Sequence, residues 1–265
     1  MLFAIPFLQI DPVLFSIGPF AVRWYALSYV AGLLFGFQLL RRRAARSSDD
    51  VSADNIDDFL VWATIGIILG GRLGYVLFYN LQYFLANPLE IFATWRGGMS
   101  FHGGLLGVVI AGLLFCRRHK LSPLILGDML ACAAPIGLFF GRIANFINGE
   151  LYGRVTDAPW GVVFPYGGPE PRHPSQLYEA FLEGLVLFVV LNIMWRSEKV
   201  RANSGVLTGS FIAGYAIARM IVELFRQPDS HIGFLTLGST MGQWLSVPML
   251  IIGVGMIIWG SRRTA

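Results

Sequence analysis

The chain has 265 residues, of which 55% are hydrophobic and only 14% are charged, with a formal net charge of +4. Soluble globular domains carry about 25% charged residues, so this composition and a mean hydropathy of +0.62 exclude an ordinary soluble enzyme, a disordered chain and a coiled coil. The two cysteines, Cys116 and Cys132, are too few for a disulfide-rich scaffold.

Seven apolar segments along the chain are predicted to be membrane-spanning helices. A helix crosses the hydrocarbon core with about 20 residues, and continuous rather than alternating apolar runs favour helices over a barrel. We therefore expect an all-α, polytopic membrane protein, with one transmembrane domain over residues 1–265 and outer-face loops at about 80–100 and 148–175. The predicted spans cover residues of about 18–40, 57–79, 101–117, 124–147, 177–195, 205–225 and 240–260.

The first segment is expected to remain as a span, because no basic residue precedes it and its apolar run is longer than that of a signal peptide. Basic residues then define the orientation. Four lie in the loops on one side: Arg96, Arg154, Arg172 and Arg226. Twelve lie on the other side: Arg41, Arg42, Arg43, Arg46, Arg117, Arg118, Lys120, Arg196, Lys199, Arg201, Arg262 and Arg263. This asymmetry predicts an outer N-terminus and a cytoplasmic C-terminus, and it accounts for the basic charge without a nucleic-acid partner.

Ionisable groups within the spans gather at one predicted depth. Arg142 lies about 27 Å along the fourth span and Arg219 about 21 Å along the sixth, at 1.5 Å per residue, in the outer third of a core about 30 Å thick. The spans that run the other way begin near this level with a second group of polar residues, namely Arg23, Tyr25, His102, Glu179 and Glu183. This agreement predicts a polar cavity in the outer half of the membrane.

The sixth span places Tyr215, Arg219 and Glu223 on one helix face, because they are spaced four residues apart. A buried ion pair between Arg219 and Glu223 is one interpretation. The other is that Arg219 and Arg142, two guanidiniums at one depth, bind an anion such as a lipid phosphate.

His102 begins the third span, and either a structural hydrogen bond or a role as a base fits that position. The sequence contains no HExxH pair, Cys/His cluster, GxSxG turn or P-loop. We therefore expect no metal site.

The run GRIANFINGELYG, from Gly141 to Gly153, resembles the signature G-R-x-[GA]-N-F-x-N-x-E-x-x-G of the bacterial prolipoprotein diacylglyceryl transferases. All of its fixed positions match: Gly141, Arg142, Ala144, Asn145, Phe146, Asn148, Glu150 and Gly153. Similar segments of that family are RWYALSY at 23–29, GGRLGY at 70–75, SFHGG at 100–104, RHPSQLYE at 172–179 and GYAIARMIVELFR at 214–226.

The resemblance implies a reaction in which the diacylglyceryl group of phosphatidylglycerol moves to the lipobox cysteine thiol of a prolipoprotein, and glycerol phosphate is released. It further implies a multi-pass protein of the bacterial plasma (inner) membrane, with its active site toward the outer face and no cofactor. The expected partners are phosphatidylglycerol, prolipoprotein signal segments and membrane lipids.

The same resemblance implies roles for individual residues. Arg142 and Arg219 would be catalytic through the donor phosphate, and His102 would be the general base or a group that orients substrate. The remaining matched positions are assigned to substrate binding, together with the two arginines: Tyr25, Asn145, Glu150, Gly153, Tyr215 and Glu223.

Two other functions use the same features. A transporter or channel for an anionic solute would also need buried arginines, although the sequence shows no internal repeat and few charges in the inner half of the spans. A seven-helix receptor would not require paired arginines at headgroup depth.

Overall fold

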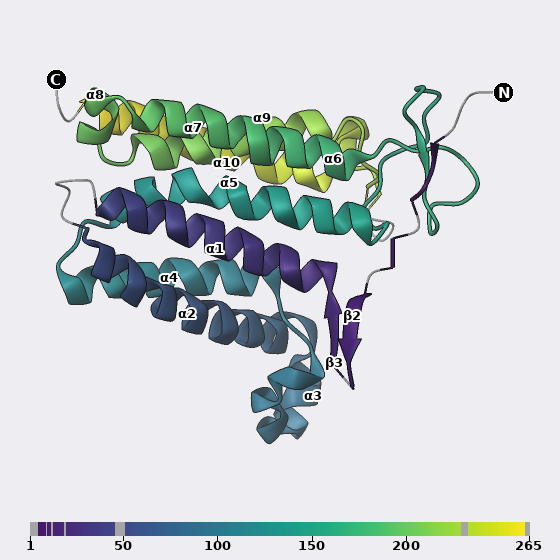
Figure 1. Cartoon of the computed structure of the whole chain (residues 1–265), viewed down its shortest axis with the longest axis horizontal. Helices are drawn as coiled ribbons and strands as arrows, with labels where there is room; N and C mark the ends of the chain where they lie inside the picture. Colours follow the sequence, from purple (N-terminus) through teal and green to yellow (C-terminus); the bar gives the residue numbers. More distant parts are fainter. Residues whose placement is uncertain are drawn as a thin grey trace. The chain divides into compact units, whose positions relative to one another are not determined.

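The computed structural model describes residues 5–8, 10–11, 13–18, 20–45, 51–228 and 233–262, and most of them are helical (Figure 1). The principal helices in chain order are α1 (Trp24–Ala44), α2 (Ala53–Tyr79), α3 (Leu81–Ala86), α4 (Phe101–His119), α5 (Pro123–Ile147), α6 (Ser175–Glu179), α7 (Leu187–Trp195), α8 (Glu198–Ala202), α9 (Val206–Val222) and α10 (Met241–Arg262). The short elements are η1 (Pro88–Phe92), η2 (Thr94–Arg96), the π-helical η3 (Ala180–Val186) and η4 (Thr236–Gly238).

Five helices among the described residues are long and apolar enough to cross a membrane, in agreement with a multi-pass membrane protein. Helix α9, with 17 residues, is a shorter apolar helix, and α1 occupies most of the first predicted span. The count of seven spans and their orientation therefore stay predictions. The five helices are 53–79, 101–119, 123–147, 175–195 (α6, η3 and α7 in one continuous helix) and 241–262.

The start of the first predicted span is wrong, because residues 20–23 form a strand and the helix begins only at Trp24. Strand β2 (Val13–Ile17) pairs antiparallel with β3 (Phe20–Arg23), and Gly18 between them has a φ of +59°, which glycine adopts readily. A second small sheet pairs β1 (Ile5–Pro6) in parallel with β4 (Val162–Val163). The protein is therefore mainly rather than purely α-helical.

The chain forms two compact units, one from residues 1–38 and 127–265 and the other from residues 39–126. Each unit has its own packing. The expectation of a single domain stays a prediction.

In the unit of residues 39–126, α2 and α4 pack through glycines. A Cβ atom on Gly74 would lie 2.7 Å from Cα of Gly103, and one on Gly70 would lie 2.7 Å from Cα of Gly107. Atoms of a real side chain do not approach so closely, so only glycine permits this backbone contact, as small residues do between helices in lipid.

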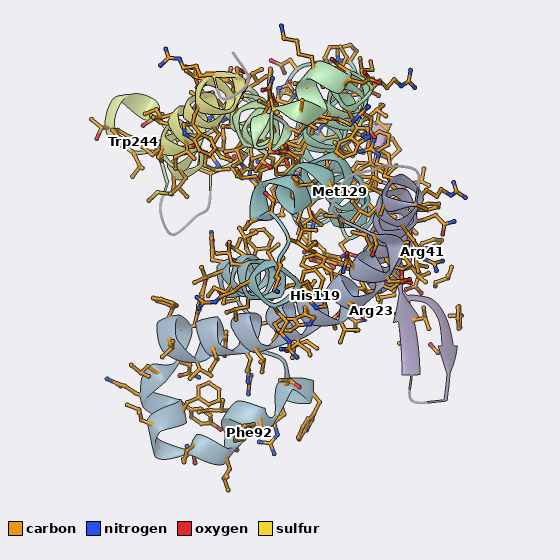
Figure 2. All side chains as sticks on the ribbon, turned by 90° about the vertical axis from the view of Figure 1, so that its left-hand side faces the viewer. Arg23, Arg41, Phe92, His119, Met129 and Trp244 are labelled. Carbon is orange, nitrogen blue, oxygen red and sulfur yellow. The ribbon has the colours of Figure 1, made fainter. Side chains whose placement is uncertain are left out.

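Arg72, which is buried on α2, binds backbone carbonyl groups. Its guanidinium donates hydrogen bonds to the carbonyl oxygens of Glu90 (2.6 Å), Ile91 (2.7 Å) and Gly97 (2.6 Å). The arginine thereby holds the α3–η1–η2 segment against α2, while Phe92 of that segment remains exposed (Figure 2).

In the unit of residues 1–38 and 127–265, α9 packs against α7 and α10 (Figure 1). Asp128 on α5 accepts hydrogen bonds from the backbone N–H groups of Gly205 and Thr208, both at 2.7 Å, and so caps the start of α9. The buried charge of Asp128 therefore has a structural role. Cys116 and Cys132 are buried, and they form no disulfide.

We predict that Gly103→Ala destabilises the protein by about 1–3 kcal/mol, because the new methyl group meets the backbone of α2. Thermal unfolding in detergent measures this loss. The control is Gly112→Ala on the same helix, where a Cβ atom would meet only a ring carbon of Phe59 at 3.7 Å. Equal unfolding midpoints for the two variants would contradict the packing argument.

Candidate functional site

Three arginines and three glutamates form a buried charged cluster in the unit of residues 1–38 and 127–265. Both glutamates of the α6–η3 helix have fully buried side chains, while those of the arginines are 10–17% exposed. The charged cluster comprises Arg142 on α5, Glu179 on α6, Glu183 on η3, Arg219 on α9, and Glu223 and Arg226 just after α9.

Arg142 contacts both glutamates of the α6–η3 helix. Its Nε and Nη2 donate hydrogen bonds to Oε2 of Glu183 at 3.3 and 3.1 Å. Its Nη1 lies 3.3 Å from Oε2 of Glu179. The two carboxylates therefore fix the orientation of the Arg142 guanidinium.

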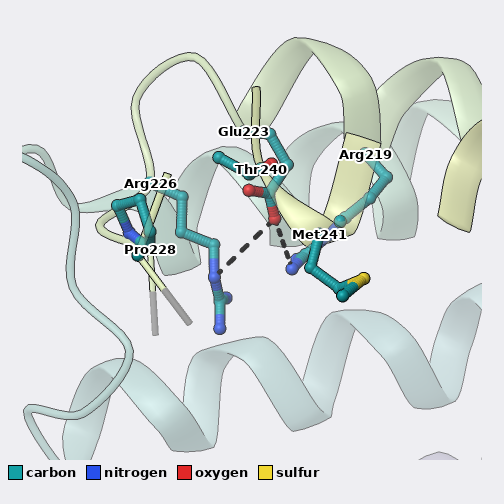
Figure 3. A pocket seen from close by; sticks show the side chains of 8 residues that line it. Arg219, Glu223, Arg226, Pro228, Thr240 and Met241 are labelled. Atoms are coloured by element: carbon teal, nitrogen blue, oxygen red, sulfur yellow. Dashed lines mark ion pairs between the residues drawn. The ribbon is translucent and has the colours of Figure 1, made fainter. Parts of the chain in front are cut away.

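Arg219 contacts the other oxygen of the Glu179 carboxylate. Its Nη1 donates to Oε1 of Glu179 and its Nη2 pairs with Oε1 of Glu223. Arg226 donates from Nη1 to the same Glu179 oxygen at 2.8 Å. Figure 3 shows Glu223 between Arg219 and Arg226. Glu179 thus bridges Arg142 and Arg219, and the binding of an anion by these two arginines stays a prediction.

The local sequence explains how these side chains meet. Glu179 and Glu183 lie four residues apart, so they share a helix face. The helix has a π-helical turn over Ala180–Val186, a feature that often occurs at functional sites. A Cβ atom on Gly184 would lie 2.7 Å from Cβ of Phe139, so this glycine lets η3 approach α5 closely. Arg142 of α5 then reaches Glu183.

The signature segment forms a second polar group beside α5. The carboxylate of Glu150 accepts hydrogen bonds from the side-chain amides of Asn145 (2.8 Å) and Asn148 (3.3 Å). The side chain of Gln176 donates to the backbone carbonyl of Glu150 at 2.6 Å. Asn145 and Glu150 therefore contact each other, and their role in substrate binding stays a prediction.

Gly153 lies where backbone segments approach closely. A Cβ atom on it would lie 2.6 Å from the carbonyl oxygen of Phe225 and 2.7 Å from Cβ of His173. Its N–H donates to the carbonyl oxygen of His173 at 2.8 Å. The glycine thereby joins the signature to the residues that follow α9.

The other predicted site residues lie outside the ion pairs. The hydroxyl of Tyr25 is 3.1 Å from that of Tyr29. Tyr215 is close enough to Glu183 and Arg142 to interact with them electrostatically. His102 is the second residue of α4, in the unit of residues 39–126, and its exposed ring makes an edge contact with Phe101.

Sequence reasoning missed two arginines. Arg226 is expected from the sequence to be an outer-loop charge, and it does lie beyond the end of α9, but its guanidinium reaches Glu179. Arg154 donates from Nε and Nη2 to the backbone carbonyls of Arg226 (3.0 Å) and Glu223 (2.9 Å), so it caps the end of α9. Burial and this arginine together lower the pKa of His173 below its ordinary value.

The charges of the cluster balance, and the space beside it is small. Three guanidiniums and three carboxylates give a formal sum of zero, so the cluster is an ion-pair network rather than a region of net positive charge. A pocket of about 40 Å³ lies against Arg219, Glu223 and Arg226 (Figure 3), which is enough space for a water molecule. Among the described residues, no group of His, Cys, Asp and Glu is arranged to hold a metal ion.

Apolar helices long enough to span a membrane, with a buried arginine–glutamate cluster between them, define a membrane protein with a polar site inside its helical region. The family model for prolipoprotein diacylglyceryl transferase matches residues 12–259. The chain belongs to that family.

Two full-length relatives carry the name phosphatidylglycerol–prolipoprotein diacylglyceryl transferase. The relative from Rhodospirillum rubrum is 59% identical over 264 residues, which cover 99% of this chain and 96% of the relative. The relative from Paramagnetospirillum magneticum is 55% identical, with 100% of this chain and 99% of the relative covered.

We predict that Glu179→Gln lowers the free energy of unfolding by about 3–5 kcal/mol, because it removes one charge from a buried network and leaves guanidiniums without their shared partner. Chemical unfolding in detergent measures the change. Glu90→Gln is the control, because Glu90 pairs with Arg96 at the surface, where ion pairs contribute little. If both variants unfold at the same denaturant concentration as the unsubstituted chain, the network does not stabilise the fold.

Proposed function

We propose that this chain transfers the diacylglyceryl group of phosphatidylglycerol to the lipobox cysteine thiol of prolipoproteins, forming a thioether and releasing glycerol phosphate. The names of its full-length relatives support this reaction. The observation that carries it is the contact of Arg142 and Arg219, from two separate helices, with the single carboxylate of Glu179.

The location that we propose is the bacterial plasma (inner) membrane, with the site toward its outer face. The asymmetric distribution of basic residues in the loops supports this orientation. The lipobox cysteine would reach the site beside the outer loop of residues 148–175, which is rich in proline and glycine. The proposed reaction needs no metal or organic cofactor.

In the proposed reaction, the cysteine sulfur attacks the carbon of the diacylglyceryl group that is bonded to a phosphate oxygen. The new bond is carbon–sulfur, and the bond that breaks joins this carbon to the phosphate oxygen. Glycerol phosphate leaves with the electron pair and gains negative charge. Guanidiniums that are already held in place stabilise this developing charge better than mobile ones, because they need not reorganise during the reaction.

The carboxylates of the charged cluster leave donors for such a phosphate. A guanidinium has five N–H donors, and the hydrogen bonds and ion pairs of Arg219 to Glu179 and Glu223 engage only its two terminal nitrogens. We therefore assign the glutamates the role of orienting Arg142 and Arg219. The other N–H groups of the two arginines would bind the donor phosphate.

The thiol proton needs an acceptor, since the thiolate is the nucleophile and an ordinary cysteine has a pKa near 8.5. The family resemblance makes His102 our candidate base, and orientation of the substrate is its alternative role. Tyr25, Asn145, Glu150, Gly153 and Tyr215 are proposed to line the lipid and peptide sites.

The experiment that tests the function uses purified protein in vesicles that contain phosphatidylglycerol with a labelled diacylglyceryl group, together with a lipobox peptide. Label on the peptide cysteine and release of glycerol phosphate are the expected results. A peptide with serine in place of the cysteine is the control. Movement of an anionic solute across the vesicle without labelled peptide would instead favour a transporter.

We predict that Arg219→Lys lowers kcat/KM about 100-fold or more in this assay. A lysine ammonium is a point charge and cannot contact Glu179 and Glu223 while also presenting further donors in one plane. Arg96→Lys is the matched control, since the Arg96 side chain is 63% exposed and pairs with Glu90. Normal turnover by Arg219→Lys would exclude planar phosphate binding by this residue.

His102→Gln separates the two proposed roles of that residue. Loss of a general base is expected to lower kcat about 100-fold or more and to remove one ionisation from the pH profile. The profile of kcat against pH, measured for both forms, gives the answer. Near-normal kcat with an unchanged profile would show that His102 does not accept the thiol proton.

A further inference from the structure

We propose that Gly242, the second residue of α10, is a positioning residue for the site. Its missing side chain lets the Glu223 carboxylate lie against the first turn of α10, which holds Arg219 in place. Its effect on turnover rests on the function proposed above, but the contact itself does not.

Glu223 connects the charged cluster to the end of α9. Its side chain is 4% exposed. Its Oε1 pairs with Arg219 and lies 4.0 Å from Nε of Arg226 (Figure 3). Three carboxylates pair with the terminal nitrogens of Arg219. Glu179 and, at 4.0 Å, Glu183 are fully buried, while Glu223 is the one that reaches α10.

Gly242 is the point where α10 meets this carboxylate. A Cβ atom on Gly242 would lie 2.6 Å from Cδ and 3.1 Å from Cγ of Glu223. The smaller distance is below any normal contact between carbon atoms. Any other residue at position 242 therefore requires the Glu223 side chain to move. Because that side chain is flexible, the expected response is displacement of the carboxylate and not loss of the fold.

The first turn of α10 is fixed by its own residues. Thr240 and Gln243 cap it reciprocally: each backbone N–H donates to the other residue's side chain, at 3.1 and 3.3 Å. Ser246 donates to the carbonyl oxygen of Gly242 at 2.7 Å. These hydrogen bonds therefore oppose movement of the first turn of α10. The positive end of the helix dipole also favours the Glu223 carboxylate beside it.

Gly242→Ala is expected to move the Glu223 carboxylate away from Arg219. The guanidinium then keeps Glu179 but loses the partner on its second terminal nitrogen. A misplaced transition-state donor lowers kcat and kcat/KM together. We expect a fall in kcat of about 10- to 100-fold, with KM changed less than about twofold.

The matched control is Gly255→Ala. Gly255 lies on the same helix, and a Cβ atom there would meet nothing within 4 Å. Both substitutions add one methyl group to α10, so the control measures the general effect of alanine. Kinetics with the labelled phosphatidylglycerol and lipobox peptide are expected to be unchanged for Gly255→Ala.

A double-mutant cycle on thermal unfolding tests the contact without reference to the reaction. Gly242→Ala alone is expected to lower the unfolding midpoint by about 2–4 °C. In a chain that also carries Glu223→Ala, the same substitution is expected to leave the midpoint unchanged or raise it, because the carboxylate is gone and alanine favours the helix.

The outcomes separate this inference from the proposed function. Coupling between positions 242 and 223, with reduced kcat for Gly242→Ala, supports the inference. Equal effects of Gly242→Ala with and without Glu223 would overturn it, and so would full activity of Gly242→Ala. If the unsubstituted protein transfers no lipid while the coupling is present, the proposed function fails and the positioning contact stands.

Discussion

The structure of the site depends on one carboxylate. Glu179 is fully buried, and its two oxygens contact guanidiniums from α5, from α9 and from the turn after α9. A charge in such a position is costly to bury unless it is paired and hydrogen-bonded. Three arginines around it offset that cost, and Glu183 and Glu223 balance the arginines in turn. The network is therefore a scaffold that holds guanidiniums at fixed positions, and its use in catalysis would follow from this fixed arrangement rather than from an excess of positive charge.

Backbone features outside the charges bring the network together. The π-helical turn of η3 and the contact of Gly184 with Phe139 bring Glu183 to Arg142. At the other end, Gly153 allows the signature to approach the backbone after α9, and the next residue, Arg154, binds the carbonyls of Glu223 and Arg226. The signature thus contributes twice: once through the side chain of Arg142, and once through a close backbone contact that only a glycine permits.

The sequence predicts those parts of the fold that depend on local pattern. Apolar runs gave the long helices, and helical depth brought Arg142 and Arg219 to one level, where the structure has them in contact with Glu179. Partners distant in sequence were harder to predict, because Arg142 and Glu183 are separated by 41 positions and nothing local pairs them. Arg226 was predicted to be a loop charge. Residues 20–23 were predicted to begin a helix, because an apolar run fits a strand as well as a helix. Arg72, an arginine within a predicted span, binds backbone carbonyls and belongs to the packing of α2.

Arg72 also has a consequence for the biogenesis of the protein. The carbonyl oxygens that surround its guanidinium come from residues 90–98, which follow α2 in the chain. These acceptors follow Arg72 by 18–26 positions in the chain, so they leave the ribosome after α2 does, and a bare guanidinium costs several kcal/mol in hydrocarbon. We therefore expect α2 to reach its stable position only together with residues 90–98, so that this helix and the segment after it fold as one unit.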